Sequence, residues 1–156
     1  LIEKQINNSL KLGWKKEDII LVTSFPYEYQ GVKGVVLNDK INKSDVIFHL
    51  LTQEIVKEAE LWWYHDLDVF QVYPMDSSLI DLEDTTAGFI NIGNFFFRKG
   101  SDKIFEWTRN RAIRLRSDET AALMSLVNEN YRNINTMYKK LDGKRLTQIF
   151  NKLRIK

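Results

Sequence analysis

Residues 61–70 read LWWYHDLDVF, and this stretch decides how the rest of the sequence is interpreted. A continuous run of large apolar and aromatic side chains is typical of a strand that is buried on both faces. The run ends in two carboxylates, Asp66 and Asp68, which are costly to bury unless a positive charge meets them. Side chains two residues apart on an extended chain point the same way, so we expect both carboxylates to bind one hard cation, Mg²⁺ or Mn²⁺.

The composition limits the classes of protein to which the chain can belong. Its length of 156 residues predicts a single domain, residues 1–156, that buries about two thirds of the unfolded surface. The 44% of hydrophobic and 28% of charged residues are typical of soluble globular proteins. The net charge of +2 gives no argument for a nucleic-acid partner. The absence of cysteine excludes disulfide, zinc-thiolate and thiol chemistry, and it suits a reducing, cytoplasmic location.

The two ends of the sequence carry further expectations. The chain begins at Leu1 instead of Met and opens on a helical pattern, so we expect that its start was removed or that it is part of a longer chain. No apolar run is long enough for a membrane span, and no signal peptide is visible.

Residues 139–156 are predicted to form a basic C-terminal helix or tail. Lys and Arg are frequent in this segment, and Asp142 is its one acid. The apolar residues on one face of such a helix would be Leu146, Ile149, Phe150 and Leu153. The favoured interpretation is a surface helix that packs on the domain and leaves its basic face in solvent. The alternative is peripheral contact with a membrane surface or an acidic partner.

The spacing of apolar residues predicts an α/β fold. Helices are predicted for the segment that ends at Gly13 and for residues 42–60, with Ser44 as N-cap, 101–115 and 118–131. Strands are predicted for residues 19–24, 35–37, 61–64 and, as a strand or hairpin, 87–98, with a loop over residues 27–34. The alternation of helices and strands indicates a largely parallel sheet. Ligands of such sheets bind at the carboxyl ends of the strands, where we expect Asp66 and Asp68.

A cation held by two acids would need further ligands. Mg²⁺ usually keeps waters and takes its remaining ligands from substrate phosphates, which predicts chemistry on a diphosphate. One reaction that fits is phosphoryl transfer of the haloacid-dehalogenase kind, but Phe70 stands where that D-x-D-x-T/V motif has Thr or Val. The other is glycosyl transfer from a nucleotide-sugar, in which the metal stabilises the departing diphosphate.

Three segments resemble GT-A-type nucleotide-sugar glycosyltransferases in the order of that family. Residues 62–70 resemble its D-x-D region and follow a predicted helix, as in the family. Residues 91–97, NIGNFFF, resemble the N-x-G strand that lines the sugar and acceptor pocket. Residues 118–123, DETAAL, resemble the D-E/Q-x-x-L segment, whose acid faces the acceptor. The resemblance covers about residues 14–130 and implies a GT-A-like, mostly parallel sheet flanked by helices. The domain would be short or N-terminally incomplete, because GT-A domains usually begin with a nucleotide-binding strand.

The resemblance also implies roles for individual residues. Asp68 would be the main metal ligand, and Asp66 would bind the metal or the ribose of the nucleotide. Asn91 and Gly93 would shape the sugar pocket. Asp118 or Glu119 would bind the acceptor hydroxyl or act as the general base. No histidine follows His65, so the third metal ligand would come from an acid, a water or a phosphate oxygen.

The expected function is therefore metal-dependent transfer of a sugar from a UDP- or GDP-sugar to an acceptor hydroxyl. A metal-dependent phosphotransferase or nucleotidyltransferase is one alternative, and a non-catalytic binding module with a degenerate transferase fold is another. Simpler roles also exist for the later motifs. Asp118 and Glu119 would stabilise a helix start through its dipole, and Asn91 and Gly93 would form a turn or a bulge.

Overall fold

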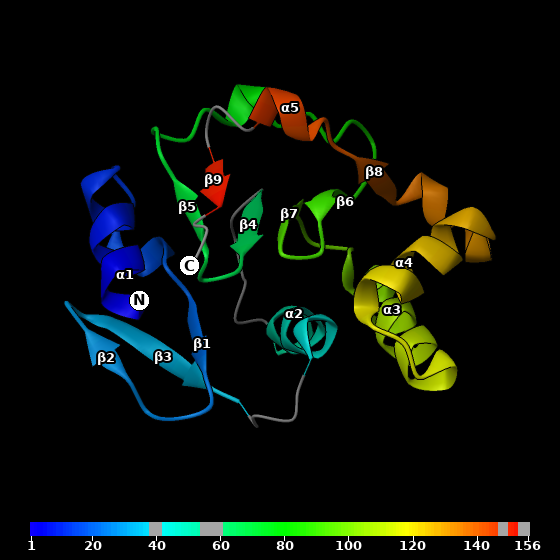
Figure 1. Cartoon of the computed structure of the whole chain (residues 1–156), viewed down its shortest axis with the longest axis horizontal. Coiled ribbons are helices and arrows are strands. Elements are labelled where there is room, and N and C mark those ends of the chain that lie inside the picture. The colour runs from blue at the N-terminus through cyan, green and yellow to red at the C-terminus, as the bar shows by residue number, and fades with distance from the viewer. Residues whose placement is uncertain (38–41, 54–60, 147–149, 153–156) are drawn as a thin grey trace. The chain divides into compact units, whose positions relative to one another are not determined.

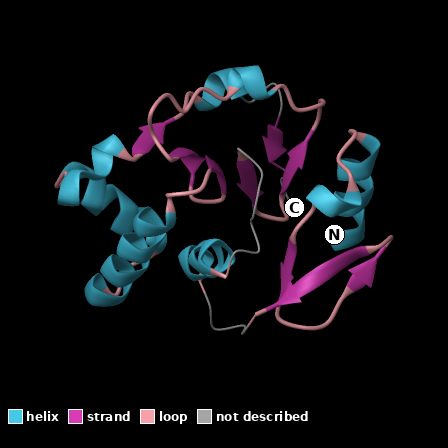
Figure 2. Cartoon of the chain, turned by 180° about the vertical axis from the view of Figure 1, so that it is seen from behind, coloured by secondary structure: helices cyan, strands magenta, loops and turns pink. Residues whose placement is uncertain are grey.

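The computed structural model describes residues 1–37, 42–53, 61–146 and 150–152 of the chain (Figure 1). The chain divides into two compact units. The first contains Leu1–Ile41, His65–Leu79 and Gly143–Lys156, and the second contains Asn42–Tyr64 and Ile80–Asp142. Both units combine helices with strands (Figure 2), which confirms the α/β class.

The first unit contains a three-stranded sheet in the order β1-β3-β2. Its strands are β1 (Leu21–Thr23), β2 (Glu28–Tyr29) and β3 (Val32–Val36), and β3 is parallel to β1 but antiparallel to β2. Gln30 and Gly31 join β2 to β3 with φ values of 50° and 81°. Two-residue hairpin turns favour this left-handed backbone. The predicted loop over residues 27–34 is therefore wrong in part, because these residues include a hairpin.

The remaining elements of the first unit are α1, β5 and β9, together with short helices. The helix α1 (Ile2–Lys11) matches the predicted first helix, and Gly13 follows it with a φ of 97°. The strand β5 (Val69–Gln71) pairs with β9 (Phe150–Lys152) in antiparallel fashion. The short elements are the 3₁₀ turns at Lys16–Asp18 and Ser77–Leu79 and the helix α5 (Gly143–Leu146).

The basic C-terminal segment is not a continuous helix. It contains the end of β8 (Tyr138–Lys140), then α5 and β9. The helical face predicted from Leu146 to Leu153 is wrong, because residues 150–152 pair with β5 in a sheet. The predicted face residues Ile149 and Leu153 lie outside the described residues.

The second unit contains a four-stranded sheet in the order β4-β7-β6-β8. Its strands are β4 (Trp62–His65), β6 (Ala87–Asn91), β7 (Asn94–Phe97) and β8. The strand β6 is antiparallel to β7 and parallel to β8. The predicted, largely parallel sheet is therefore wrong, since the three-stranded and four-stranded sheets are both mixed. The tight hairpins β2–β3 and β6–β7 impose antiparallel pairing, because parallel neighbours need a long crossover.

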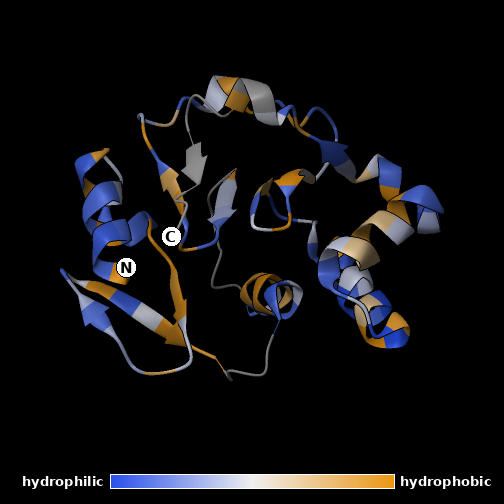
Figure 3. Cartoon of the chain, viewed as in Figure 1, coloured by the Kyte–Doolittle hydropathy of each residue, from blue (hydrophilic) through white to orange (hydrophobic). Residues whose placement is uncertain are grey.

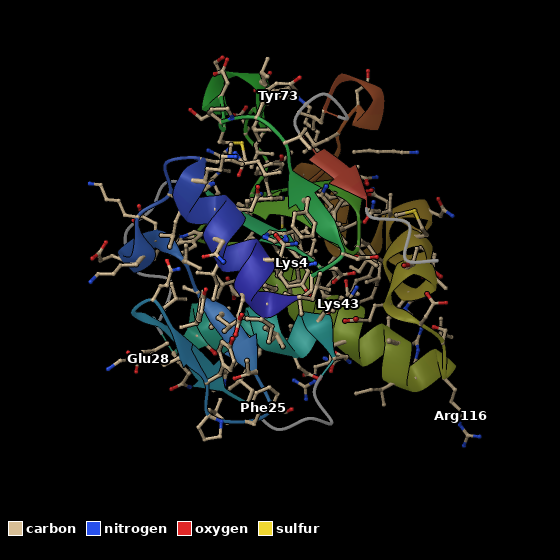
Figure 4. All side chains as sticks on the ribbon, turned by 60° about the vertical axis from the view of Figure 1, so that its left-hand side comes forward. Lys4, Phe25, Glu28, Lys43, Tyr73 and Arg116 are labelled. Carbon is tan, nitrogen blue, oxygen red and sulfur yellow. The ribbon has the colours of Figure 1, made fainter. Side chains whose placement is uncertain are left out.

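Three helices accompany this sheet: α2 (Lys43–Thr52), α3 (Asp102–Leu115) and α4 (Glu119–Asn128). The predicted helices at 101–115 and 118–131 are confirmed, although α4 ends at Asn128 and a 3₁₀ segment, Tyr131–Thr136, follows. The predicted N-cap of α2 is wrong, because Asn42 holds that position and Ser44 lies inside the helix. Part of the predicted helix, residues 54–60, lies outside the described chain. Figure 4 shows Arg116 extending away from the end of α3.

Aromatic rings, together with buried aliphatic side chains, form the core of the second unit. The rings of Phe89, Phe95 and Phe105 lie with centroids 4.8 to 6.1 Å apart, and each side chain is buried. On β4, Tyr64 stacks on Phe95 at 4.7 Å. All four residues of β4 are half-buried, so its predicted burial on both faces is wrong. These contacts hold the β6–β7 hairpin against α3 and attach β4 to the same sheet.

Candidate functional site

The two predicted metal ligands lie in one tight turn between β4 and β5. Asp66 follows the last residue of β4, and Asp68 precedes the first residue of β5. The N–H of Val69 donates to the carbonyl of Asp66 at 3.0 Å, which closes the turn. Both acids are half-buried, whereas Leu67 between them is 41% exposed. The extended chain predicted for the two acids is therefore wrong, and side-chain alternation does not determine their directions. Asp is also common at the first position of such turns for purely local reasons.

His65 adds no positive charge beside the two acids at neutral pH. Its Nδ1–H donates to the carbonyl of Asp66 at 2.9 Å. Burial lowers the pKa of His65, and hydrogen bonding to the backbone of Asp66 opposes that change less strongly. The ring is therefore neutral at neutral pH.

Gln5 of α1 holds the backbone of this acidic turn, which we define as residues 66–69. Its Nε2 donates to the carbonyls of Leu67 at 2.7 Å and Val69 at 2.8 Å. The side chain is 5% exposed. This role of Gln5 was not predicted from the sequence. The sequence does place a polar residue, Gln5, beside Ile6 on the buried side of an amphipathic helix. This pattern indicates a buried hydrogen bond but does not identify the groups that accept it.

A cation at the acidic turn would need ligands beyond the two acids. No group of three or more His, Cys, Asp or Glu that could hold a metal occurs in the part of the chain that the structure describes. The carboxylate oxygens of Asp66 and Asp68 are ligands of the kind that Mg²⁺ and Mn²⁺ prefer. With at most two carboxylates from this turn, waters and phosphate oxygens would complete the coordination.

Asn91 and Gly93 belong to the β6–β7 hairpin turn. The Oδ1 of Asn91 accepts a hydrogen bond from the N–H of Gly93 at 2.8 Å, and the register shifts between Phe89 and Asn91. The simpler interpretation, a turn with a bulge, is thus confirmed, and their role in a sugar pocket stays a prediction. Asn94, which was not predicted, is 5% exposed and accepts a hydrogen bond from Trp63 Nε1–H at 2.7 Å. This bond ties the hairpin to β4.

Asp118 caps the helix that it precedes. Its Oδ1 accepts a hydrogen bond from the N–H of Ala121 at 2.8 Å, and the residue is exposed. A capping oxygen of this kind satisfies one of the backbone donors that a helix start leaves without a partner.

Glu119 caps a different helix. Its Oε1 accepts from the N–H of Ser44 at 2.6 Å, and its Oε2 accepts from the N–H of Lys43 at 3.2 Å. Asn42 Oδ1 accepts from Asp45 N–H at 2.9 Å in the same helix start. The negative charge of Glu119 also suits the positive end of the α2 dipole. Glu119 therefore has a structural role, and its role as acceptor base stays a prediction.

The predicted site residues fall into two sets. Asp66 and Asp68 belong to the first unit. The second unit contains Asn91, Gly93, Asp118 and Glu119. The structure brings Asp66 and Asp68 into one turn and Asn91 and Gly93 into another, and it uses Asp118 and Glu119 at the starts of α4 and α2.

Within the described ranges, no helix has both the length and the apolar character needed to cross a membrane. Comparison with known proteins adds no relationship, since no family model, curated protein or solved structure matches this chain.

Proposed function

We propose that this chain is a GT-A-like glycosyltransferase domain that transfers a sugar from a UDP- or GDP-sugar to an acceptor hydroxyl with Mg²⁺ or Mn²⁺. The observation that carries the proposal is the half-buried acidic turn directly after β4, with Asp66 and Asp68 two residues apart. The order of the D-x-D, N-x-G and D-E segments along the chain supports it.

Asp68 would be the main metal ligand, and Asp66 would bind the metal or the nucleotide ribose. When bound, the metal ion would offset the negative charge that develops on the leaving diphosphate. The acceptor hydroxyl would form a bond to the anomeric carbon while the bond to the diphosphate oxygen breaks, and the hydroxyl proton would pass to a base. The hairpin turn of Asn91 and Gly93 would line the sugar pocket.

Asp118 is the better of the two candidates for the acceptor base. Both carboxylate oxygens of Glu119 accept backbone hydrogen bonds from α2. Asp118 is exposed and uses Oδ1 for its cap. A general base must reach the proton that it removes, and an exposed carboxylate meets that condition more easily than one held at a helix end.

The test is a melting-temperature screen of UDP, GDP and their sugar conjugates, with and without Mn²⁺, followed by turnover assays. A ligand at about 100 times its dissociation constant should add about 2.7 kcal/mol to the free energy of unfolding. Asp68→Asn should abolish the Mn²⁺-dependent shift and the turnover. Asp84→Asn is the matched control, because Asp84 is an exposed acid in another turn. If Asp68→Asn shows the same Mn²⁺-dependent shift in melting temperature as the unmodified chain, Asp68 is not a metal ligand.

A non-catalytic binding module is the second candidate. The capping contacts of Asp118 and Glu119 support it, since they account for both acids without any catalytic duty. Such a module would bind a nucleoside diphosphate without turnover. Release of phosphate from simple phosphate esters, with no dependence on a sugar, would instead indicate a phosphotransferase.

A further inference from the structure

We infer that Gln5 is a positioning residue that holds the acidic turn in the conformation that binds the cation. The inference rests on the proposed function, because it assigns Gln5 a role at the same metal site. It differs from the proposed function in naming a residue on α1, a helix to which the proposed function assigns no metal ligand.

The contacts of Gln5 are specific to the turn. Its amide nitrogen donates to the carbonyls of Leu67 and Val69, which lie on either side of Asp68. A glutamine amide has two N–H groups, so one side chain can satisfy both carbonyls. The side chain is 5% exposed, and a buried carbonyl that loses its donor costs free energy. Movement of Asp68 would therefore break one buried hydrogen bond, to Val69, and one part-buried hydrogen bond, to Leu67.

The turn is also closed by its own backbone. The N–H of Val69 donates to the carbonyl of Asp66, so the two ends of the turn are joined without Gln5. Gln5 on α1 adds two further hydrogen bonds to the turn. One is to the carbonyl of Leu67, between the two acids, and the other is to the carbonyl of Val69, after Asp68. Together these bonds order the segment that carries Asp66 and Asp68 before any ligand arrives. Supporting hydrogen bonds of this kind pre-organise a site and lower the entropy lost on binding.

The composition of α1 supports a polar anchoring role. Its ribbon is largely hydrophilic in Figure 3, and Ile6 is a buried apolar residue beside Gln5. Two further side chains from this region, those of Asn8 and Trp14, bind Gln71: Asn8 Nδ2 donates to its carbonyl at 2.9 Å, and Trp14 Nε1 donates to its Oε1 at 2.7 Å. These bonds fasten the end of β5 instead of the acidic turn.

Asn8 therefore provides a matched control for Gln5. Both residues lie on α1, and both donate a side-chain amide to a backbone carbonyl of the same chain segment. If Gln5 only anchors α1, the loss of either amide should have the same consequences. If Gln5 positions the acids, only its loss should change the affinity for the cation.

The experiment is a titration of the full chain with Mn²⁺ alone, followed by the electron paramagnetic resonance signal of the free ion. Gln5→Met keeps the length of the side chain but removes the donors, and it should raise the Kd for Mn²⁺ by about tenfold, the lower end of the range for residues that support metal ligands. Asn8→Ala should leave the Kd within about twofold, because its bond lies beyond the turn. Gln5→Asn, whose amide is too short to reach both carbonyls, should act in the same direction if Gln5→Met folds poorly.

A second measurement needs no metal. Hydrogen exchange of the Val69 amide, followed by NMR, should be faster in Gln5→Met than in Asn8→Ala. Equal Mn²⁺ affinity in the unmodified chain and in the Gln5 variants would overturn the inference and leave the proposed function intact. If Asn8→Ala loses as much Mn²⁺ affinity as the Gln5 variants, the inference is also overturned, because the loss would then come from weaker anchoring of α1 in general. If the unmodified chain binds no Mn²⁺, the proposed function fails, and the positioning role fails with it.

Discussion

At the scale of single residues, two buried hydroxyl groups stand out. Ser44 Oγ and Ser101 Oγ have no hydrogen-bond partner among the residues that the structure describes, and their side chains are 1% and 0% exposed. A buried hydroxyl without a partner costs free energy that a methyl group does not.

We therefore expect Ser101→Ala to raise the free energy of unfolding by about 1 kcal/mol. Urea denaturation measures this value. The control is Ser125→Ala, which should lower it, because Ser125 Oγ accepts from Arg111 at 2.7 Å and donates to Glu129 at 3.1 Å. A loss of stability in Ser101→Ala would show that the hydroxyl has a partner in solution.

Glu129 gives a pH-dependent prediction. The hydrogen bond from the Arg111 guanidinium lowers the pKa of Glu129 below its ordinary value of 4.5, and a hydrogen bond from Ser125 acts the same way. A carboxyl whose pKa is lower in the folded state stabilises the fold above its unfolded pKa. That stability is lost as the pH falls from about 4.5 through the lowered pKa. The effect is small, since the Glu129 side chain is 55% exposed and solvent screens the pair.

Glu129→Gln should therefore lower the melting temperature at pH 7, and the difference from the unmodified chain should shrink below about pH 4.5. Thermal melts across pH 3 to 7 would measure it. Glu106→Gln is the control, because Glu106 pairs with Lys103 on the surface of α3 at 3.1 Å and such pairs contribute little. If the difference in melting temperature between Glu129→Gln and the unmodified chain stays constant with pH, the charge of the Glu129 carboxylate does not contribute to stability.

At the scale of elements, the start of α2 depends on a side chain from another helix. Asn42 caps it locally, while Glu119 from α4 supplies acceptors for two of its backbone N–H groups. Arg109 of α3 pairs with Asp45 of α2 at 2.8 Å. The three helices of the second unit are thus joined at one end of α2 by polar contacts as well as by apolar packing.

Glu119→Ala should lower the free energy of unfolding by about 2 kcal/mol, because charged acceptors at helix starts are worth more than neutral ones. Asp118→Ala removes an exposed cap and should cost about 1 kcal/mol. Denaturant titration compares the two variants. The reverse order, with Asp118→Ala the more harmful, would contradict the assignment of Glu119 as the bridge between α4 and α2.

The same elements show how far the sequence predicts local structure. The spacing of Ile2, Ile6 and Leu10 predicts α1 correctly, because helical periodicity acts over a few residues. The direction of strand pairing was predicted less well. The β2–β3 hairpin depends on a left-handed pair, Gln30 and Gly31, and Gln is not a residue that signals such a turn.

At the scale of the whole molecule, the division into two units gives a test of which unit binds the proposed nucleotide-sugar donor first. Asp66 and Asp68 both belong to the first unit. Mn²⁺ with a nucleoside diphosphate should therefore slow hydrogen exchange first in residues 65–71 and in α1, which holds the acidic turn. Mass spectrometry of exchanged peptides would measure the change. Asp68→Asn is the control, and protection that appears in α3 and α4 alone would place the ligand in the second unit.

The sequence by itself determined the α/β class, the positions of α1, α3 and α4, a strand or hairpin over residues 87–98 and the acid pair that follows a strand. These features depend on residues that are close together in the sequence, so their periodicity and turn residues can be read from the sequence directly. Only the tertiary structure decided that Gln5 holds the carbonyl of Leu67, 62 residues away, and that Glu119 binds the start of α2, 75 residues away. The physical reason is that a hydrogen-bonding side chain can serve any complementary group, so its partner is set by which distant segments fold together.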